Sequence, residues 1–286
     1  MRSDSRSIEL HSAQEAVEVA LRLSQSWFRG QPKPYGKLVP RIFRDEFSDE
    51  ILQAVKPDLE LSMFESFRRA APAILDKTPA ADDYLSWLFV MQHHGTPTRL
   101  LDWTQSALAA LYFAASESLD ADGELWALYP VALNRKSNIT GLPLSQSKVL
   151  RFLASEFAQT DRARYANRLG LKSVPKYPLA YAPPLLFPRM VAQRSVFTIH
   201  PKPSNGGSIP DLLPEAKHLV RYSIPAKRKA GILLELRFLG ITRGTLFPDL
   251  EGLSRSVIDE HKTVGYSPPE PPSWGHENGH GPRRAR

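Results

Sequence analysis

Two apolar segments joined by a short polar turn constrain this chain more than any other feature. Residues 82–93 are apolar nearly all round a helix, and residues 105–119 form a second apolar helical run. A helix that is apolar on every side has to be buried. Between the two, Gly95 ends the first helix and Pro97 keeps Thr96 out of the α region, which predicts a turn. The polar side chains of this turn are therefore held at a fixed place beside the core.

The composition describes a globular chain. Its 286 residues, of which 42% are hydrophobic, are enough for one large domain or two modest ones. The absence of cysteine excludes disulfide bonds, thiol catalysis and thiolate metal sites. There is no run of about 18 apolar residues and no apolar secretory segment near Met1, so we expect a cytoplasmic protein with no membrane partner.

Periodicity and capping residues predict the secondary structure. The expected helices cover residues 12–24, 48–70, 82–93, 105–119, 145–168, 226–239 and 249–262. The expected strands lie at Trp27–Phe28 and at residues 123–133, 194–201 and 218–225. Residues 171–188, with their five prolines, are expected to form a long ordered loop.

These elements predict an α+β fold. We expect a single compact domain of mixed helices around a small, mostly antiparallel sheet, spanning residues 1–264 with a motif core at 26–133. The basic segment 265–286 is rich in Pro and Gly, and we expect it to be a disordered tail.

Charge and motifs remove several function classes. The net charge of +7 permits contact with a polyanion, although the cations look spread along the chain apart from clusters at 227–229 and 283–286. No phosphate-binding glycine loop, no H-E-x-x-H and no G-x-S-x-G is present. Adjacent His93 and His94 point to different faces of a helix, so no metal site is expected.

Two segments, Trp27–Gln31 and Gln92–Ser116, place unusual polar residues among aromatics and turn residues. Arg29 can hold a phosphate or carboxylate with two hydrogen bonds, and Gly30 would let such a ligand approach the backbone. Equally, Arg29 can be a structural ion-pair residue facing Asp102. In either case we expect Arg29 to meet the 94–103 turn in one pocket, within about 15 Å of Asp102.

Other side chains of these segments also allow two interpretations. His93 and His94 can act in catalysis or can cap the carbonyl groups at a helix end. Trp103 and Tyr112 can stack on a base or on a nicotinamide ring, or can belong to the core. Thr104 can cap the following helix, whose N-terminus is itself a site for anions.

Taken together, the two segments resemble the FRG domain family, which is named after the Phe-Arg-Gly triplet found here at 28–30. The family pattern runs W-F-R-G-Q, then Q-H-x-G-x-P-T-R-L-L-D-W-T, then a helix containing A-L-Y-F-A. This chain matches it at residues 27–31, 92–104 and 110–114. Residues 193–197 resemble the family's Q-x-G-x-F, with Ser195 in place of the glycine.

A second resemblance is to ADP-ribosyltransferases, in which an Arg-Gly strand, a Ser/Thr-bearing strand and a terminal Glu surround NAD. Arg29–Gly30 resembles the first element, and Thr104–Ser106 stands in the place of the second. His94–Gly95–Thr96 is similar to the His-Gly-Thr turn of related transferases. The third element departs from the pattern, because Gln193 precedes a strand where Glu is expected.

The resemblance implies an NAD site without a metal. The implied catalytic residues are Arg29, His94, Thr104 and Gln193. The implied NAD-binding residues are Phe28, Arg29, Gly30, Gln31, His93, His94, Gly95, Thr96, Arg99, Asp102, Trp103 and Tyr112. Arg29 would hold the pyrophosphate, while a carboxylate near the ribose would stabilise the positive charge of the transition state.

The leading hypothesis is an ADP-ribosyltransferase that modifies a nucleic acid or protein acceptor as a toxin or phage-defence effector. An antitoxin or another component of the same system is then an expected partner. The alternative is a non-catalytic module that binds a nucleotide or nucleic acid with the same residues. A third, structural interpretation treats Arg29, His94 and Asp102 as a buried network. A carboxylate close to Arg29 and Thr104 would favour the enzyme.

Overall fold

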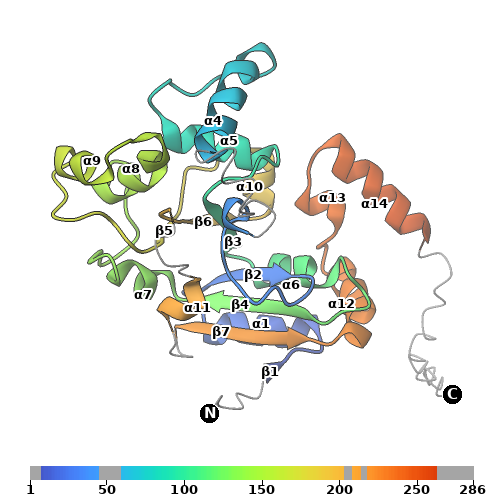
Figure 1. Cartoon of the computed structure of the whole chain (residues 1–286). Coiled ribbons are helices and arrows are strands. Elements are labelled where there is room, and N and C mark those ends of the chain that lie inside the picture. Colours follow the sequence, from blue (N-terminus) through green and yellow to red (C-terminus); the bar gives the residue numbers. More distant parts are fainter. Residues whose placement is uncertain (1–7, 45–58, 203–207, 214–217, 263–286) are drawn as a thin grey trace, which may run out of the picture.

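A computed structural model describes residues 8–44, 59–202, 208–213 and 218–262 (Figure 1). Within these ranges the strands form one seven-stranded sheet in the order β1-β7-β4-β2-β3-β6-β5. The strands are β1 (Ile8–Glu9), β2 (Trp27–Gln31), β3 (Leu100–Thr104), β4 (Gly123–Leu128), β5 (Leu179–Tyr181), β6 (Ser195–Ile199) and β7 (Leu219–Ile224). Among these seven described strands only β1 and β7 pair in parallel, so the predicted α+β fold with a mostly antiparallel sheet is confirmed.

The helices lie between and around the strands. They are α1 (Ala13–Arg22), α4 (Leu59–Ala70), α5 (Tyr84–His93), α6 (Ala107–Ala115), α7 (Pro130–Arg135), α8 (Lys148–Ser155), α9 (Arg162–Arg168), α10 (Pro188–Ala192), α11 (Ile209–Leu212), α12 (Ala226–Phe238), α13 (Arg243–Leu246) and α14 (Leu250–Lys262). Short 3-10 turns occupy Arg41–Phe43, Ala71–Ala73 and Glu156–Ala158. Among the described residues no helix has the length and apolar character needed to cross a bilayer.

Three hydrophobic clusters of the described residues pack on the sheet. The first packs α1, α6 and α12 against β2, β4 and β7, and the second packs α4, α5 and α8 against β3, β5 and β6 (Figure 1). The third cluster joins the two halves, because it contains residues from β2, β3, β4 and β6. Neighbouring residues of a strand point to opposite faces, so Phe28 enters the first cluster whereas Trp27 enters the third.

The sheet opens between β2 and β3. These two strands share a single register pair, Phe28 with Thr104. Each is fully paired on its other side, since β2 makes five pairs with β4 and β3 makes five with β6. The two central strands therefore diverge beyond Phe28, and the divergence leaves space in the middle of the sheet.

Most predicted elements are confirmed at nearly their expected bounds, including α1, α5, β6, β7, α12 and α14. Other expectations are wrong in extent. The strand expected at 123–133 ends at Leu128, because Pro130 is well suited to the first turn of a helix and begins α7. The helix expected at 145–168 is divided into α8 and α9. The loop expected at 171–188 contains β5, and its last residue begins α10.

Some elements were not expected from the sequence at all. The sequence predicts a turn where the central strand β3 lies, because four of its five residues are buried and it lacks an alternation of polar and apolar residues. The short elements β1, α11 and α13 were also missed. Residues 48–58 of one expected helix and the expected tail at 265–286 lie outside the described residues.

Gly30 is required for packing. A Cβ atom at this position would overlap the carbonyl oxygen of Ala110 and would lie 2.6 Å from the backbone nitrogen of Ala114, both in α6. The small alanines of α6 bring that helix directly onto β2. The expectation that Gly30 makes room for a ligand is therefore wrong on this side of the strand, where the helix already fills the space.

We expect Gly30→Ala to lower the free energy of unfolding by about 1–3 kcal/mol, because the added methyl group forces α6 away from β2. Urea unfolding measures this loss. Gly141→Ala is the matched control, since a Cβ there meets nothing within 4 Å. Equal effects of the two substitutions would contradict the packing role.

Candidate functional site

A pocket of about 280 Å³ lies where β2 and β3 diverge. We call it the β2–β3 pocket. Its walls come from β2, β3 and β6, from the C-terminal ends of α5 and α6, and from α10. The segments that resemble known families thus meet here, although β2 and β3 are about seventy residues apart in the sequence.

Arg29 bridges the gap between the two strands. Its Nη1 donates a 2.6 Å hydrogen bond to the backbone carbonyl of Asp102, which confirms that these residues lie together. The Nε of Arg29 is inaccessible to solvent and has no hydrogen-bond partner among the described residues. Burial lowers the pKa of Arg29 to about 10, against the opposing attraction of Asp102. Arg29 remains a cation at neutral pH and keeps an unused donor.

The carboxylate of Asp102 is held from the other side. The amide nitrogen of Gln92 donates to its Oδ2 at 2.8 Å, and Thr98 donates to the amide oxygen of Gln92 at 2.6 Å. Thr98 is fully buried, so it fixes which way the Gln92 amide faces. The chain therefore presents an exposed, oriented carboxylate at the pocket.

His93 and His94 have different positions. The ring of His93 lines the pocket and stacks on Phe187, with centroids 4.3 Å apart. Burial lowers the pKa of His93, and the neighbouring His94 and Arg189 lower it further. At neutral pH His93 is therefore uncharged. His94 is exposed, follows the last residue of α5 and is absent from the pocket lining.

Two charged residues of the pocket were not identified from the sequence. Arg189 of α10 lies with its guanidinium 4.3 Å from the ring centre of Phe247, and burial lowers its pKa, with the attraction of Asp102 opposing. Glu117 follows α6 and supplies a second exposed carboxylate. Glu117 could have been identified from the sequence, because it comes directly after the helix that contains A-L-Y-F-A. Arg189 lies one helical turn before Gln193, a relation visible only once α10 was recognised.

Thr104 and Gln193 fix the base of the pocket. Thr104 donates to the backbone carbonyl of Gln193 at 2.6 Å, and the Gln193 amide donates to the carbonyl of Leu246 at 3.0 Å. Ser195, which replaces the family's glycine, is the first residue of β6. Arg194, the residue before it, adopts the left-handed backbone conformation, with a φ of 47°. The turn therefore forms without a glycine at position 195.

The structure brings most of the expected site residues together. Those that line the pocket are Phe28, Arg29, Gly30, His93, Asp102, Trp103, Thr104 and Gln193. Those that do not line it are Gln31, His94, Gly95, Thr96, Arg99 and Tyr112. Tyr112 belongs to the first hydrophobic cluster, and Gln31 accepts a hydrogen bond from the indole of Trp126. Gly95 serves the turn, because its φ is +83°.

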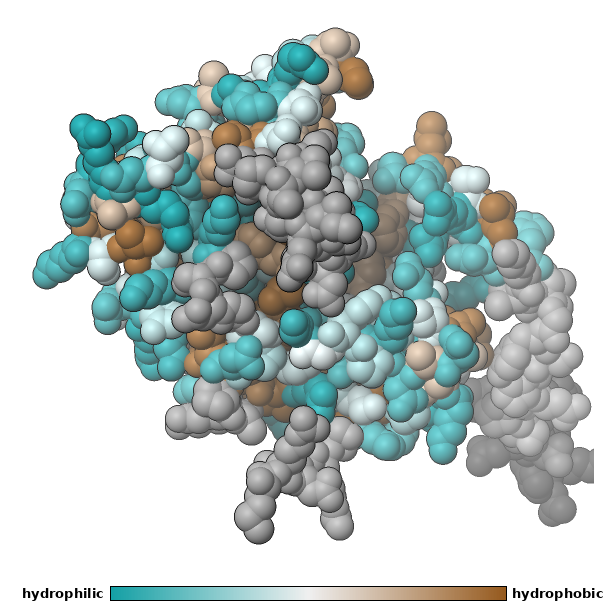
Figure 2. All heavy atoms as spheres, in the orientation of Figure 1, coloured by the Kyte–Doolittle hydropathy of each residue, from teal (hydrophilic) through white to brown (hydrophobic). Residues whose placement is uncertain are grey.

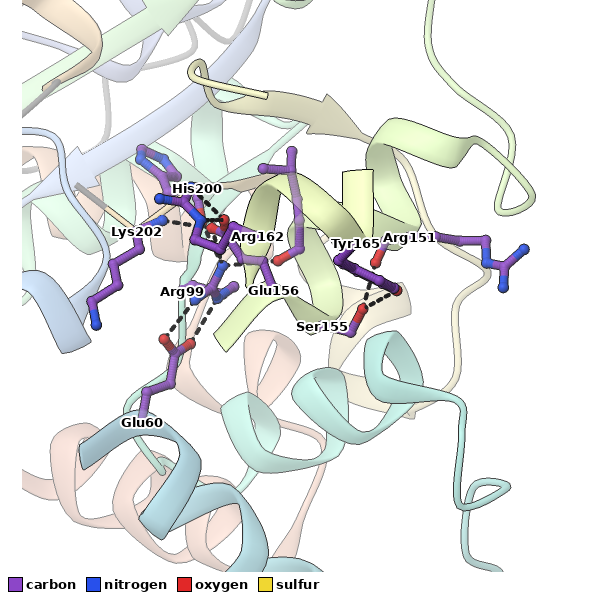
Figure 3. A network of polar contacts seen from close by, with 10 residues as sticks. Glu60, Arg99, Arg151, Ser155, Glu156, Arg162, Tyr165, His200 and Lys202 are labelled. Carbon is purple, nitrogen blue, oxygen red and sulfur yellow. Dashed lines mark hydrogen bonds and ion pairs between the residues drawn. The ribbon is translucent and has the colours of Figure 1, made fainter. Parts of the chain in front are cut away.

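Arg99 is the centre of a separate buried network (Figure 3). It makes two hydrogen bonds with Glu60, of 2.8 and 2.7 Å, and one of 2.6 Å with Glu156. The Arg99 side chain is fully buried. Burial by itself lowers the pKa of Arg99, but the carboxylates of Glu60 and Glu156 outweigh this effect and raise the pKa above its ordinary value. The Arg99 guanidinium therefore links α4 to the segment after α8 and does not line the β2–β3 pocket.

The network continues towards the sheet. Glu156 also pairs with Arg162 and accepts from the backbone nitrogen of Lys202 (Figure 3). Burial lowers the pKa of nearby His200 to about 3, and the positive charge of Arg99 adds to this. His200 is therefore neutral at physiological pH, and its ring lies 3.0 Å from the hydroxyl of Thr198.

Fold and site define an α+β protein whose split central sheet encloses a polar pocket with two arginines and two carboxylates. Residues 24–123 match the family model of the FRG domain, and this range holds β2, α5, β3 and α6. The match supports the FRG family, as the Phe28–Arg29–Gly30 triplet had indicated. No curated protein and no solved structure matches the chain. Among the described residues no group of three or more His, Asp or Glu could hold a metal ion.

Proposed function

We propose that the β2–β3 pocket binds NAD and that the chain transfers ADP-ribose to a nucleic acid or protein acceptor. The observation that carries this proposal is that two guanidinium groups, of Arg29 and Arg189, and two carboxylates, of Asp102 and Glu117, line one pocket. Guanidinium groups bind phosphate oxygens through charge-assisted hydrogen bonds, so the two arginines suit a pyrophosphate.

The size of the pocket is consistent with part of the dinucleotide. Ligand sites commonly enclose about 300–1,000 Å³, and this pocket of about 280 Å³ lies just below that range. It suits a nicotinamide riboside with its phosphates better than a whole dinucleotide. The buried, unpartnered Nε of Arg29 offers a hydrogen-bond donor to such a ligand.

The chemistry needs a carboxylate and a proton acceptor. In the proposed reaction the bond between the ribose anomeric carbon and the nicotinamide nitrogen breaks, and the electron pair leaves with nicotinamide. The positive charge that develops on the ribose would be stabilised by Asp102, which Gln92 holds in place. The acceptor oxygen or nitrogen then bonds to the anomeric carbon and gives its proton to Glu117 or to neutral His93.

A toxin or phage-defence effector acting in the cytoplasm is the biological role that we propose for such an enzyme, with an antitoxin or another system component as its partner. One observation favours the non-catalytic alternative. The Gln193 amide, at the position where transferases carry Glu, bonds to the carbonyl of Leu246. A pocket with this amide can bind a nucleotide without turning it over.

We expect the purified full chain to release nicotinamide from NAD, alone or when RNA, DNA or cell lysate supplies an acceptor. Because the charge of Asp102 is expected to stabilise the transition state, Asp102→Asn should lower the rate by about a hundredfold or more. Chromatography of the released nicotinamide measures this rate. Asp120→Asn, which removes an exposed carboxylate that does not line the pocket, is the control.

The outcomes separate the two functions. Release that Asp102→Asn abolishes supports the transferase. Binding of NAD without release under any acceptor condition supports the non-catalytic module. If calorimetry detects no binding of NAD and no nicotinamide appears, the proposal fails in both forms.

A further inference from the structure

The positive charge of the chain is concentrated in one region. Residues 134–177 contain nine Lys and Arg residues against two Asp and Glu, a net charge equal to the +7 of the whole chain. The remaining residues are thus close to neutral as a group. The cations themselves are spread along the chain, as expected, but their excess over the acidic residues lies in α7, α8, α9 and the connecting loops.

Neither acidic residue of this region forms an ion pair with its exposed cations among the described residues. Glu156 is buried and paired with Arg99 and Arg162. Asp161 caps α9 by accepting from the backbone nitrogen of Arg164 at 2.9 Å. The exposed cations have no ion pair within the described part of the chain, and they are Arg135, Lys136, Lys148, Arg151, Arg164, Arg168, Lys172 and Lys176. Hydrophilic residues predominate on the surface over α8 and α9 (Figure 2).

A second pocket opens within this charged surface. It has a volume of about 370 Å³, and its lining includes Lys136, Lys172, Lys176, Ser137 and Tyr177. We call it the α7–α9 pocket. The hydroxyl of Ser137 is inaccessible to solvent and has no hydrogen-bond partner among the described residues. A buried hydroxyl without a hydrogen-bond partner lowers the stability of the folded state, and a ligand oxygen would supply the missing hydrogen bond.

The walls of the α7–α9 pocket are held in place by one buried side chain. Asn134, in α7, is fully buried and makes hydrogen bonds of 2.7 and 3.0 Å with the backbone nitrogen and carbonyl of Ala180 in β5. It also donates to the carbonyl of Gly141 at 2.8 Å. The end of α7 and the start of β5 are thereby fixed relative to each other, and the three lysines lie on the backbone segments that these two elements border.

We propose that this surface binds single-stranded nucleic acid, with a phosphate group and its nucleotide seated in the α7–α9 pocket. The lysines that line the pocket supply the attraction for the nucleic acid backbone, and Ser137 supplies a hydrogen bond to a phosphate oxygen. The half-exposed ring of Tyr177 offers a face on which a base can stack. A single strand fits because its nucleotides can turn out into a pocket, whereas those of a duplex are stacked and paired.

This site is separate from the proposed NAD site. The α7–α9 pocket and the β2–β3 pocket share no lining residue. The proposal therefore stands or fails independently of NAD binding. If the proposed transferase activity is also present, this surface would hold a nucleic acid acceptor.

The test measures binding of a fluorescent oligouridylate of about twelve nucleotides by the full chain at several salt concentrations. We expect the triple variant Lys136→Gln, Lys172→Gln, Lys176→Gln to bind at least about tenfold more weakly. The slope of log K against log salt should fall by about 2, because each phosphate contact to a single strand contributes about 0.7. The triple variant Lys37→Gln, Lys77→Gln, Lys227→Gln makes the same charge change at exposed lysines elsewhere and should bind nearly as well as the parent.

Ser137→Ala tests the pocket without changing charge. If the hydroxyl serves a ligand, this variant should bind the oligouridylate several-fold more weakly while its melting temperature stays the same or rises, since an unsatisfied buried hydroxyl has been removed. A purely structural hydroxyl would instead lower the melting temperature and leave binding unchanged.

Three kinds of result would overturn the proposal. The first is absence of binding by the parent protein, or equal losses in the two triple variants. The second is tighter binding of a duplex than of a single strand of equal length. The third is displacement of the oligouridylate by oligoglutamate as readily as by unlabelled oligouridylate, which would mean that the surface recognises charge alone.

Discussion

Replacing Arg99 with methionine is expected to lower the free energy of unfolding by about 3–5 kcal/mol. The guanidinium is the shared partner of Glu60 and Glu156, and it is fully buried. Methionine keeps much of the side-chain volume but leaves the Glu156 carboxylate buried with one fewer cation and Glu60 without its partner. The cost comes from these unpaired charges more than from lost packing.

Urea unfolding at neutral pH measures this effect. Arg151→Met is the control, because Arg151 is an exposed arginine of α8 that forms no ion pair with any described residue, and its replacement should change stability by no more than about 0.5 kcal/mol. Adding Glu60→Gln and Glu156→Gln to Arg99→Met should recover part of the loss, since the stranded charges are then removed. Equal stability of Arg99→Met and Arg151→Met would contradict the network as a structural support.

The role of Arg99 illustrates what the sequence could not provide. Arg99 and Asp102 belong to the same T-R-L-L-D-W-T motif, and from the motif alone both were expected to bind NAD. The structure separates them because β3 begins at Leu100, which leaves Arg99 just before the strand. Its partners Glu60 and Glu156 are 39 and 57 residues away in sequence, so no local pattern reveals the pairing.

The elements that the sequence predicts well carry strong local signals. Ser12 caps α1 as expected, and Gly95 ends α5. The elements that it misses depend on distant contacts: β3 is a strand only because β6 and β2 lie beside it. The same holds for the site. Arg29 and Asp102 were expected to meet, but Arg189 was missed because α10 is too short to leave a periodic pattern.

Arg29→Ala is expected to have the opposite profile to Arg99→Met, with a large loss of binding and a small loss of stability. We expect the affinity for NAD to fall by about a hundredfold, equivalent to about 2.7 kcal/mol, because a charged, buried donor of the proposed site is removed. Stability should fall by only about 1 kcal/mol. The single hydrogen bond to the Asp102 carbonyl is lost, but the cost of burying the guanidinium is also relieved.

The contrast rests on what each arginine leaves behind. Removing Arg99 would leave the carboxylates of Glu60 and Glu156 without this cation. Removing Arg29 would not, because the Asp102 carboxylate is exposed and already accepts a hydrogen bond from Gln92. Calorimetric titration of NAD and urea unfolding on the same preparation separate the two roles, with Arg22→Ala as the control for an exposed arginine whose side chain is 76% accessible. Unchanged NAD binding together with a stability loss as large as that of Arg99→Met would make Arg29 a structural bridge between β2 and β3 and would remove it from the proposed site.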